Sequence, residues 1–128
     1  MRRKEYRINI VPIPWQRIVK YGNRCYDTDA KDRVSFGLYL SQQHNDEPLF
    51  DKPIHIDVIF YMPFSKRALK NEDTNYHSNV PYLNNLYRFL LDAMKDVLIA
   101  DDRVICSLSL KKVYDKEPRT ELIITEVV

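Results

Sequence analysis

Alternation of apolar and polar residues is the clearest pattern in this chain, and it predicts four strands. The first is Glu5–Val11, and the second, in which the alternation is strict, is Ile54–Met62. Two further alternating segments, Val104–Tyr114 and Arg119–Val127, follow each other near the end of the sequence. Because only a short loop separates these last two segments, we expect them to form an antiparallel hairpin.

Apolar residues at steps of three and four positions predict two helices. The first helix begins after Asp27 or Thr28, either of which can cap a helix, and it runs to about His44. Within this helix, Phe36 and Leu38 are expected to face the core.

The second predicted helix follows Pro81 and carries a well-formed apolar stripe. Before it, the proline-bounded segments Pro12–Tyr26 and Pro63–Pro81 are expected to be loops, the first of them stiff. Loops as long as Pro63–Pro81 are uncommon in compact domains and are often functional. Strands and helices in this order predict an α+β fold. The apolar stripe consists of Leu83, Leu86, Leu90, Ala93, Met94, Val97 and Leu98.

Composition narrows the class of protein. A chain of 128 residues fits one domain, residues 1–128, and a hydrophobic content of 45% is enough for its core. No apolar run approaches the roughly 20 residues that cross a bilayer, and the N-terminus lacks the apolar part of a signal peptide. The two cysteines, Cys25 and Cys106, do not have the spacing of a metal site. We therefore expect a cytoplasmic protein with two packed thiols.

The net charge of +2 hides an uneven distribution. Seven basic residues and one acidic residue, Glu5, give the first 24 positions a charge of +6, so the other 104 positions carry −4. A basic arm suits a polyanion as partner. Charge alone slightly favours the simpler alternative, a solvated N-terminus without a partner. The seven basic residues are Arg2, Arg3, Lys4, Arg7, Arg17, Lys20 and Arg24.

The segment HSNVPYLNNLYRFLLDAMKDVLIADDRV, residues 77–104, combines a loop, a helix and an acidic turn. Asn84, Arg88 and Asp92 are spaced four residues apart, so they share one face of the predicted helix. By itself this spacing indicates an exposed polar face, with an Arg88–Asp92 ion pair worth a few tenths of a kcal/mol.

The same segment resembles the core motif of the RusA-type Holliday junction resolvases. In that motif a His precedes Pro-Asp-x-Asp-Asn-Leu-x-Lys, and a helix with Leu-Asp-Ala leads to Asp-Asp. This chain has Tyr82 and Asn84 at the first two aspartate positions, Arg88 at the lysine position, and Asp92 within Leu-Asp-Ala. Asp102 matches the third catalytic aspartate. A neutral phenol is a poor ligand for Mg²⁺, and an amide offers an oxygen without charge.

The resemblance implies a RusA-like fold, a two-layer α+β domain with a mixed sheet and two main helices, that forms a homodimer. It also implies Mg²⁺-dependent nicking of four-way DNA junctions in recombination and repair. The implied catalytic positions are Tyr82, Asn84, Arg88 and Asp102, and the implied metal ligands are Asp101 and Asp102. Candidate contacts to DNA are Arg17, Lys20, Arg24, Lys66, Arg67, Lys70 and Arg88, with Trp15 and Tyr82 as possible stacking groups.

Three functions follow from these residues. The residue chemistry favours a protein that binds branched DNA, with catalysis weakened or lost because two carboxylates are absent. Family resemblance alone favours an active Mg²⁺-dependent junction-resolving endonuclease that uses other carboxylates, such as Glu72 or Asp73 from the long loop. The third function is a protein-interaction module that does not bind DNA.

Overall fold

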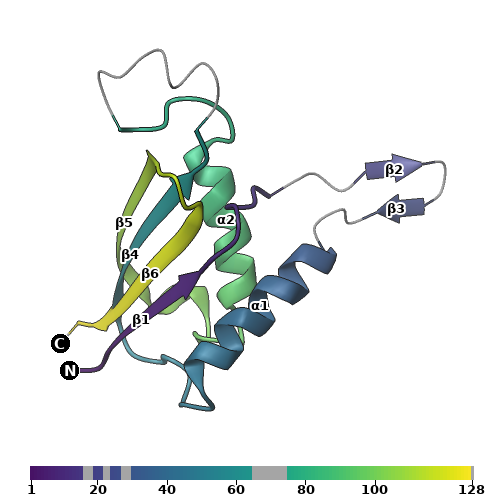
Figure 1. The fold of residues 1–128 in the computed structure, drawn as a ribbon. Helices are drawn as coiled ribbons and strands as arrows, with labels where there is room; N and C mark the ends of the chain where they lie inside the picture. Colours follow the sequence, from purple (N-terminus) through teal and green to yellow (C-terminus); the bar gives the residue numbers. More distant parts are fainter. Residues whose placement is uncertain (16–18, 22–23, 27–29, 65–74, 128) are drawn as a thin grey trace.

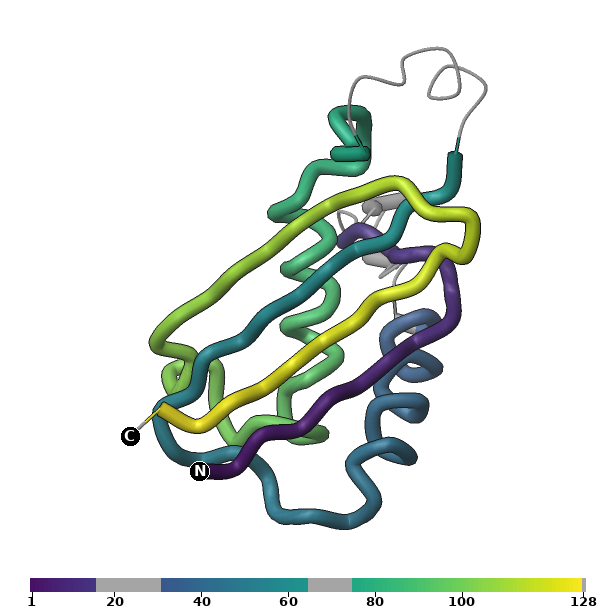
Figure 2. Tube along the Cα trace, turned by 60° about the vertical axis from the view of Figure 1, so that its left-hand side comes forward, coloured from purple at the N-terminus to yellow at the C-terminus, as the bar shows by residue number. Residues whose placement is uncertain are grey.

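A four-stranded sheet forms one layer of the protein, and two helices cover one of its faces (Figures 1 and 2). The computed structural model describes residues 1–15, 19–21, 24–26, 30–64 and 75–127. The predicted two-layer α+β fold with a mixed sheet and two main helices is confirmed. No helix in the described part of the chain is long and apolar enough to span a membrane.

The sheet consists of β1 (Arg3–Ile8), β4 (Ile54–Met62), β5 (Ile105–Tyr114) and β6 (Arg119–Glu126), in the order β1-β6-β4-β5. β4 is parallel to β5 and antiparallel to β6, and β6 is antiparallel to β1. All four predicted strands are therefore present: β4 has the predicted ends, β5 and β6 differ by one residue at one end, and β1 begins and ends two to three residues earlier. Every second residue of β4 is buried, as the strict alternation predicted.

The predicted hairpin of the last two strands is wrong, because β4 lies between β5 and β6. The loop that joins β5 to β6 passes over the end of β4, where the Asp115 N–H donates to Met62 O at 2.9 Å. A short loop allowed a hairpin but did not require one. Alternation shows which face of a strand is buried but not which strand lies beside it.

The helices α1 (Ala30–His44) and α2 (Leu83–Met94) pack against the same face of the sheet (Figure 2). Phe36 is buried, as predicted, but Leu38 is 58% exposed. Two residues along a helix correspond to about 200° of rotation, so a helix that buries Phe36 turns Leu38 outward. The predicted cap at Asp27 or Thr28 lies outside the described residues.

The second helix is shorter than its apolar stripe predicted. It ends at Met94, and the chain turns at Asp96, whose φ is 61°. Leu98 lies in this turn and is still fully buried, and its carbonyl accepts a hydrogen bond from Phe50 N–H at 2.8 Å. The apolar residues of the stripe therefore pack into the same core, although some lie in α2 and others in the turn that follows it.

Two expectations for the N-terminal segment and the cysteines are also corrected. The predicted loop Pro12–Tyr26 contains a hairpin of β2 (Val19–Tyr21) and β3 (Arg24–Tyr26), which extends away from the main sheet in Figure 1. Alternation over three residues is too short to be recognised in a sequence. Cys106, expected to be packed, is exposed at the outer strand of the sheet.

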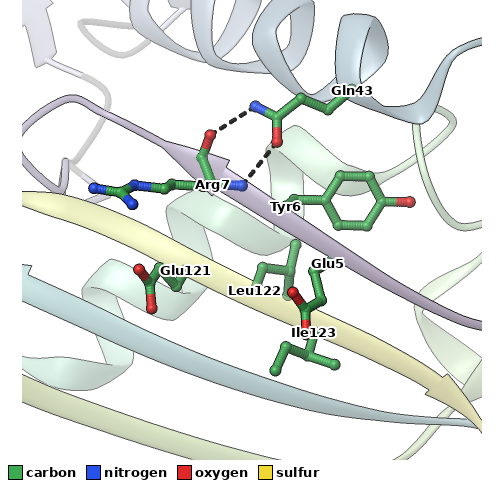
Figure 3. Close-up of a pocket in the computed structure, with 7 residues that line it drawn as sticks. All are labelled: Glu5, Tyr6, Arg7, Gln43, Glu121, Leu122 and Ile123. Carbon is green, nitrogen blue, oxygen red and sulfur yellow. Dashed lines mark hydrogen bonds between the residues drawn. The ribbon is translucent and has the colours of Figure 1, made fainter.

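The outer edge of β1 is covered at Arg7 by a side chain from α1. The Gln43 amide accepts a hydrogen bond from Arg7 N–H at 2.7 Å and donates one to Arg7 O at 2.6 Å (Figure 3). These two bonds replace those of a neighbouring strand, so they protect an edge that would otherwise be free to pair. A pocket of about 440 Å³ lies beside them, lined by Glu5, Tyr6, Arg7, Gln43, Glu121, Leu122 and Ile123.

A buried pair joins β1 to the end of α1. Tyr6 O and His44 Nδ1 are 2.7 Å apart, and His44 Nε2 lies 3.1 Å from Pro48 O. Burial raises the pKa of Tyr6, so its hydroxyl keeps the proton and donates to Nδ1. Since a carbonyl oxygen can only accept, His44 Nε2 carries the proton that is donated to Pro48 O, and Nδ1 is left as the acceptor for Tyr6.

We expect Tyr6→Phe to lower the free energy of unfolding by about 1–3 kcal/mol, since the substitution leaves buried His44 Nδ1 without a donor. Urea unfolding followed by circular dichroism measures the change. Tyr39→Phe is the matched control, because Tyr39 is exposed and loses only a solvated hydroxyl. Equal stability of the two variants would contradict the role of the Tyr6–His44 bond.

Candidate functional site

Three of the four predicted catalytic positions lie in the N-terminal half of α2. Tyr82 is the N-cap residue, and its side chain is 66% exposed. Within the described residues, no side chain makes a capping hydrogen bond at this helix end. Asn84, Arg88 and Asp92 are all exposed, which confirms the predicted polar face.

Arg88 stacks on Trp15 instead of pairing with Asp92. The guanidinium carbon lies 3.7 Å from the centre of the Trp15 ring. The backbone N–H of Trp15 donates to the backbone carbonyl of Asn85 at 2.9 Å, so the proline-rich segment is fixed to the first turn of α2. Among the described ion pairs, none joins Arg88 to Asp92. A cation–π contact of this kind orients the guanidinium and leaves its charge available to an anion.

The acidic turn Asp101–Asp102 lies beside α2. The Asp101 carboxylate accepts a hydrogen bond from Arg103 N–H at 3.0 Å and caps the short 3-10 helix η2 (Asp102–Val104). This bond holds the pKa of the Asp101 carboxyl below its usual value. Asp102 lies 3.4 Å from Lys95 Nζ. Asp102 also lines a pocket of about 340 Å³ with Tyr87, Leu91, Ile105, Cys106, Ser107 and Leu108.

Asp102 lies beside the middle of α2. Tyr87 and Leu91, which line this pocket with Asp102, follow Asn84 by three and seven residues. Oxygen ligands of Mg²⁺ lie about 2.0–2.1 Å from the ion, so two ligands of one ion are about 4 Å apart at most. The described residues contain no group of three or more His, Cys, Asp or Glu side chains placed to hold a metal ion.

These donors do not fit Mg²⁺ within a single chain. Tyr82 supplies a neutral phenol and Asn84 an uncharged amide, while the nearest cation to Asp102 is the ammonium group of Lys95. The ligand role of Asp101 and Asp102 therefore stays a prediction.

His77 anchors the loop that precedes α2. Its backbone N–H donates to Lys112 O at 2.9 Å, and its ring lies 4.7 Å from the Tyr114 ring. Lys112 Nζ in turn donates to Asn79 O at 2.6 Å and to Pro81 O at 2.7 Å. The loop is thereby fixed to β5 on the approach to Tyr82. His77 Nδ1 is covered and has no hydrogen-bond partner among the described residues.

Burial, followed by the positive charge of Lys112, lowers the pKa of His77 below its usual value of 6.5. The folded protein then binds fewer protons here than the unfolded chain does. Stability from this group is present above about pH 6.5 and is lost as the pH falls toward the folded pKa. We expect the free energy of unfolding of His77→Phe to fall less between pH 7 and pH 5 than that of the unmodified protein. Urea unfolding at each pH measures this difference. Parallel pH profiles for the two proteins would contradict the prediction.

Most of the predicted DNA contacts fall outside the described side chains. Arg17, Lys66, Arg67 and Lys70 lie outside the described residues, as do the substitute carboxylates Glu72 and Asp73. The backbone of Lys20 lies in β2 and that of Arg24 in β3. Arg88 is the predicted contact whose side chain is described.

The sequence matches the family described as Endodeoxyribonuclease RusA over residues 8–125. The chain belongs to the RusA family. The chain is also similar to the Uncharacterized protein YqaN of Bacillus subtilis (strain 168), with 26% identity over 96 residues. That similarity covers 69% of this chain and 68% of YqaN. The family match begins at the last residue of β1 and ends near the end of β6, so it includes both helices and the acidic turn.

Sequence reasoning missed two residues that shape this RusA-family site: Lys95 pairs with Asp102, and Lys112 fixes the loop before α2. Trp15 was named only as a stacking group for DNA, and its contact with Arg88 was not predicted. A lysine just after the helix gave a weak signal for the first pair. No local pattern joins Lys112 or Trp15 to α2, because both contacts connect segments far apart in the sequence.

Proposed function

We propose that this RusA-family protein binds branched DNA such as four-way junctions, and that it cuts this DNA slowly or not at all. The observation that carries the proposal is the composition of the N-terminal end of α2. Tyr82 and Asn84 stand where the family motif has carboxylates, and the cation of Arg88 is exposed one turn further along. This end of the helix therefore suits binding of the family's DNA substrate better than it suits metal-dependent cleavage of that DNA.

Electrostatics support binding over cleavage. The first turn of α2 contains no acidic residue. The N-terminus of a helix carries partial positive charge and free N–H groups, so it favours an anion. Two carboxylates at this place would attract a divalent cation and repel phosphate. Their absence therefore weakens metal binding and removes a repulsion against the DNA backbone.

A gel assay with a synthetic four-way junction tests the proposal. Without metal, the protein should shift the junction at a lower concentration than a linear duplex of the same sequence. With Mg²⁺ or Mn²⁺, the junction strands should remain intact. Equal affinity for junction and duplex would remove the shape-selective part of the proposal.

Efficient metal-dependent cleavage in that assay would favour the second function, an active junction-resolving endonuclease. Membership of an endodeoxyribonuclease family is the observation that supports this candidate. Its carboxylates would then come from Glu72, Asp73, Asp92 or Asp101. Alanine substitution at each of these positions would identify the residues that bind the metal.

We further propose a two-fold homodimer, as the family resemblance implies. The 75–77 segment covers the outer edge of β5 only at its end, through His77 N–H to Lys112 O and Tyr114 N–H to Asn75 O. No strand among the described residues pairs with the rest of this edge. Leu108 lies there and is partly exposed, which suits pairing with a second copy.

Light scattering at micromolar concentration should therefore return twice the 15.3 kDa mass of one chain. Leu108→Glu should shift the mass toward the monomer, since a charge on an edge strand opposes pairing. Leu38→Glu is the matched control, because Leu38 is an exposed leucine on α1, away from this edge. A monomer mass for the unmodified protein would refute the dimer.

A further inference from the structure

A cavity of about 520 Å³ lies at the end of the molecule where α2 begins. Three segments far apart in the sequence form its walls: the N-terminal proline segment, the exit of β4 and the loop before α2. Cavities of this size, mostly apolar with few polar groups, are typical of small-ligand sites. Six of its lining residues are Val11, Pro12, Met62, Phe64, Val80 and Pro81.

Apolar side chains around this cavity remain in contact with water. Val80 is 70% exposed, and the side chains of Val11 and Phe64 are also exposed. Tyr82, directly after the lining residue Pro81, adds another exposed ring. Clusters of exposed apolar groups on a folded protein indicate a binding surface.

Two rings of the wall, Phe64 and His77, belong to an aromatic cluster around Tyr114. The Phe64 and Tyr114 rings are stacked, with centres 5.5 Å apart and planes 12° from parallel. The His77 ring lies against the other partner, Tyr114, and His77 also lines the cavity. A planar ligand can stack on a ring of this kind. His77 Nδ1, which has no partner among the described residues, gains one if the wall adjusts around a ligand with polar edges.

Positive charge lies beside this apolar cavity. Pro14 lines the cavity, and the next residue, Trp15, carries the Arg88 guanidinium on its ring. Pro81 also lines it, and the N-terminal end of α2, free of acidic residues in its first turn, begins two residues later. The site therefore places an apolar, aromatic compartment next to groups that attract an anion. A nucleotide has both parts, a flat base and a phosphate.

We propose that this cavity receives one unstacked nucleobase of branched DNA, with an adjacent phosphate at Arg88 and the N-terminal end of α2. The inference rests on the proposed function, binding of branched DNA. Stacking of a base on aromatic side chains tolerates any sequence, because every base has a flat face. Bases at a branch point cost least to unstack, since their stacking is already interrupted. Capture of a base thus distinguishes a junction from a continuous duplex.

The test uses a synthetic four-way junction with 2-aminopurine at the branch, a base analogue whose fluorescence rises when it leaves the stack. The unmodified protein should raise this fluorescence, and a linear duplex with the same label should show no rise. Val11→Trp should fill the mouth of the cavity, and Phe64→Ala should remove one wall. Each variant should lose the fluorescence rise and bind the junction about 5- to 100-fold more weakly, with unchanged affinity for duplex.

Val34→Trp is the matched control, because Val34 is an exposed valine on α1 and does not line this cavity. It should behave as the unmodified protein does. Circular dichroism confirms that each variant is folded, and both substituted positions are exposed in the native protein. Junction binding without a fluorescence rise would overturn base capture and leave the proposed function standing, as would a Val11→Trp variant with both properties intact. Failure to bind the junction would overturn the proposed function, and base capture with it.

Discussion

Replacing Tyr82 and Asn84 together with aspartate is expected to give this protein Mg²⁺-dependent nicking activity on four-way junctions. The change restores two negative charges to the exposed N-terminal end of α2, where the structure holds a phenol and an amide. Even the outer partners of metal ligands are worth about 10–100-fold in activity, so two direct ligands should raise the nicking rate at least about 100-fold. Denaturing gels of end-labelled junction strands, with Mg²⁺ and with chelator, measure the rate.

The matched control is Tyr82→Asn, which shortens the side chain to the size of aspartate without adding charge. This variant should bind the junction and leave it uncut. In the restored protein, Asp102→Asn should abolish nicking again if Asp102 belongs to the same site. Nicking that survives Asp102→Asn would assign the third ligand to another carboxylate. Cleavage by the unmodified protein at the restored rate would contradict the proposed loss of activity.

Local patterns predicted most of the fold, because burial of alternate residues depends on neighbours in the sequence. β4 is the clearest example, since both of its predicted ends agree with the structure. The order of strands was not predictable in this way. Whether β5 pairs with β6 or with β4 depends on the core of the whole sheet, and the choice leaves the alternation of each strand unchanged.

The candidate site shows the same division. The spacing of Asn84, Arg88 and Asp92 predicted one exposed helix face, and the structure confirms that face. The resemblance assigns Asp102 to the same site, and this assignment stays a prediction. The structure shows Asp102 paired with Lys95 and lining a pocket with Tyr87 and Leu91, contacts that the motif did not give. A sequence motif gives the order of residues but not their separation in space.

Binding of branched DNA is expected to fall steeply with salt. Each phosphate neutralised on duplex DNA releases counterions and contributes about −0.9 to the slope of log affinity against log salt. If all seven predicted contacts engage phosphate, each subunit gives a slope of about −6, and affinity falls about 10³- to 10⁴-fold between 50 and 200 mM salt. Fluorescence anisotropy of a labelled junction over this range measures the slope. The seven residues are Arg17, Lys20, Arg24, Lys66, Arg67, Lys70 and Arg88.

A single substitution connects this slope to the candidate site. Arg88→Gln should make the slope shallower by about 1, because it removes one phosphate contact per subunit. Arg103→Gln is the matched control, since Arg103 is an exposed arginine of the acidic turn outside the predicted contacts, and it should leave the slope unchanged. If salt has no effect on binding, the basic residues serve only as a solvated surface. If Arg88→Gln and Arg103→Gln change the slope equally, Arg88 adds only general positive charge, and the stacked guanidinium on Trp15 does not direct a phosphate to the start of α2.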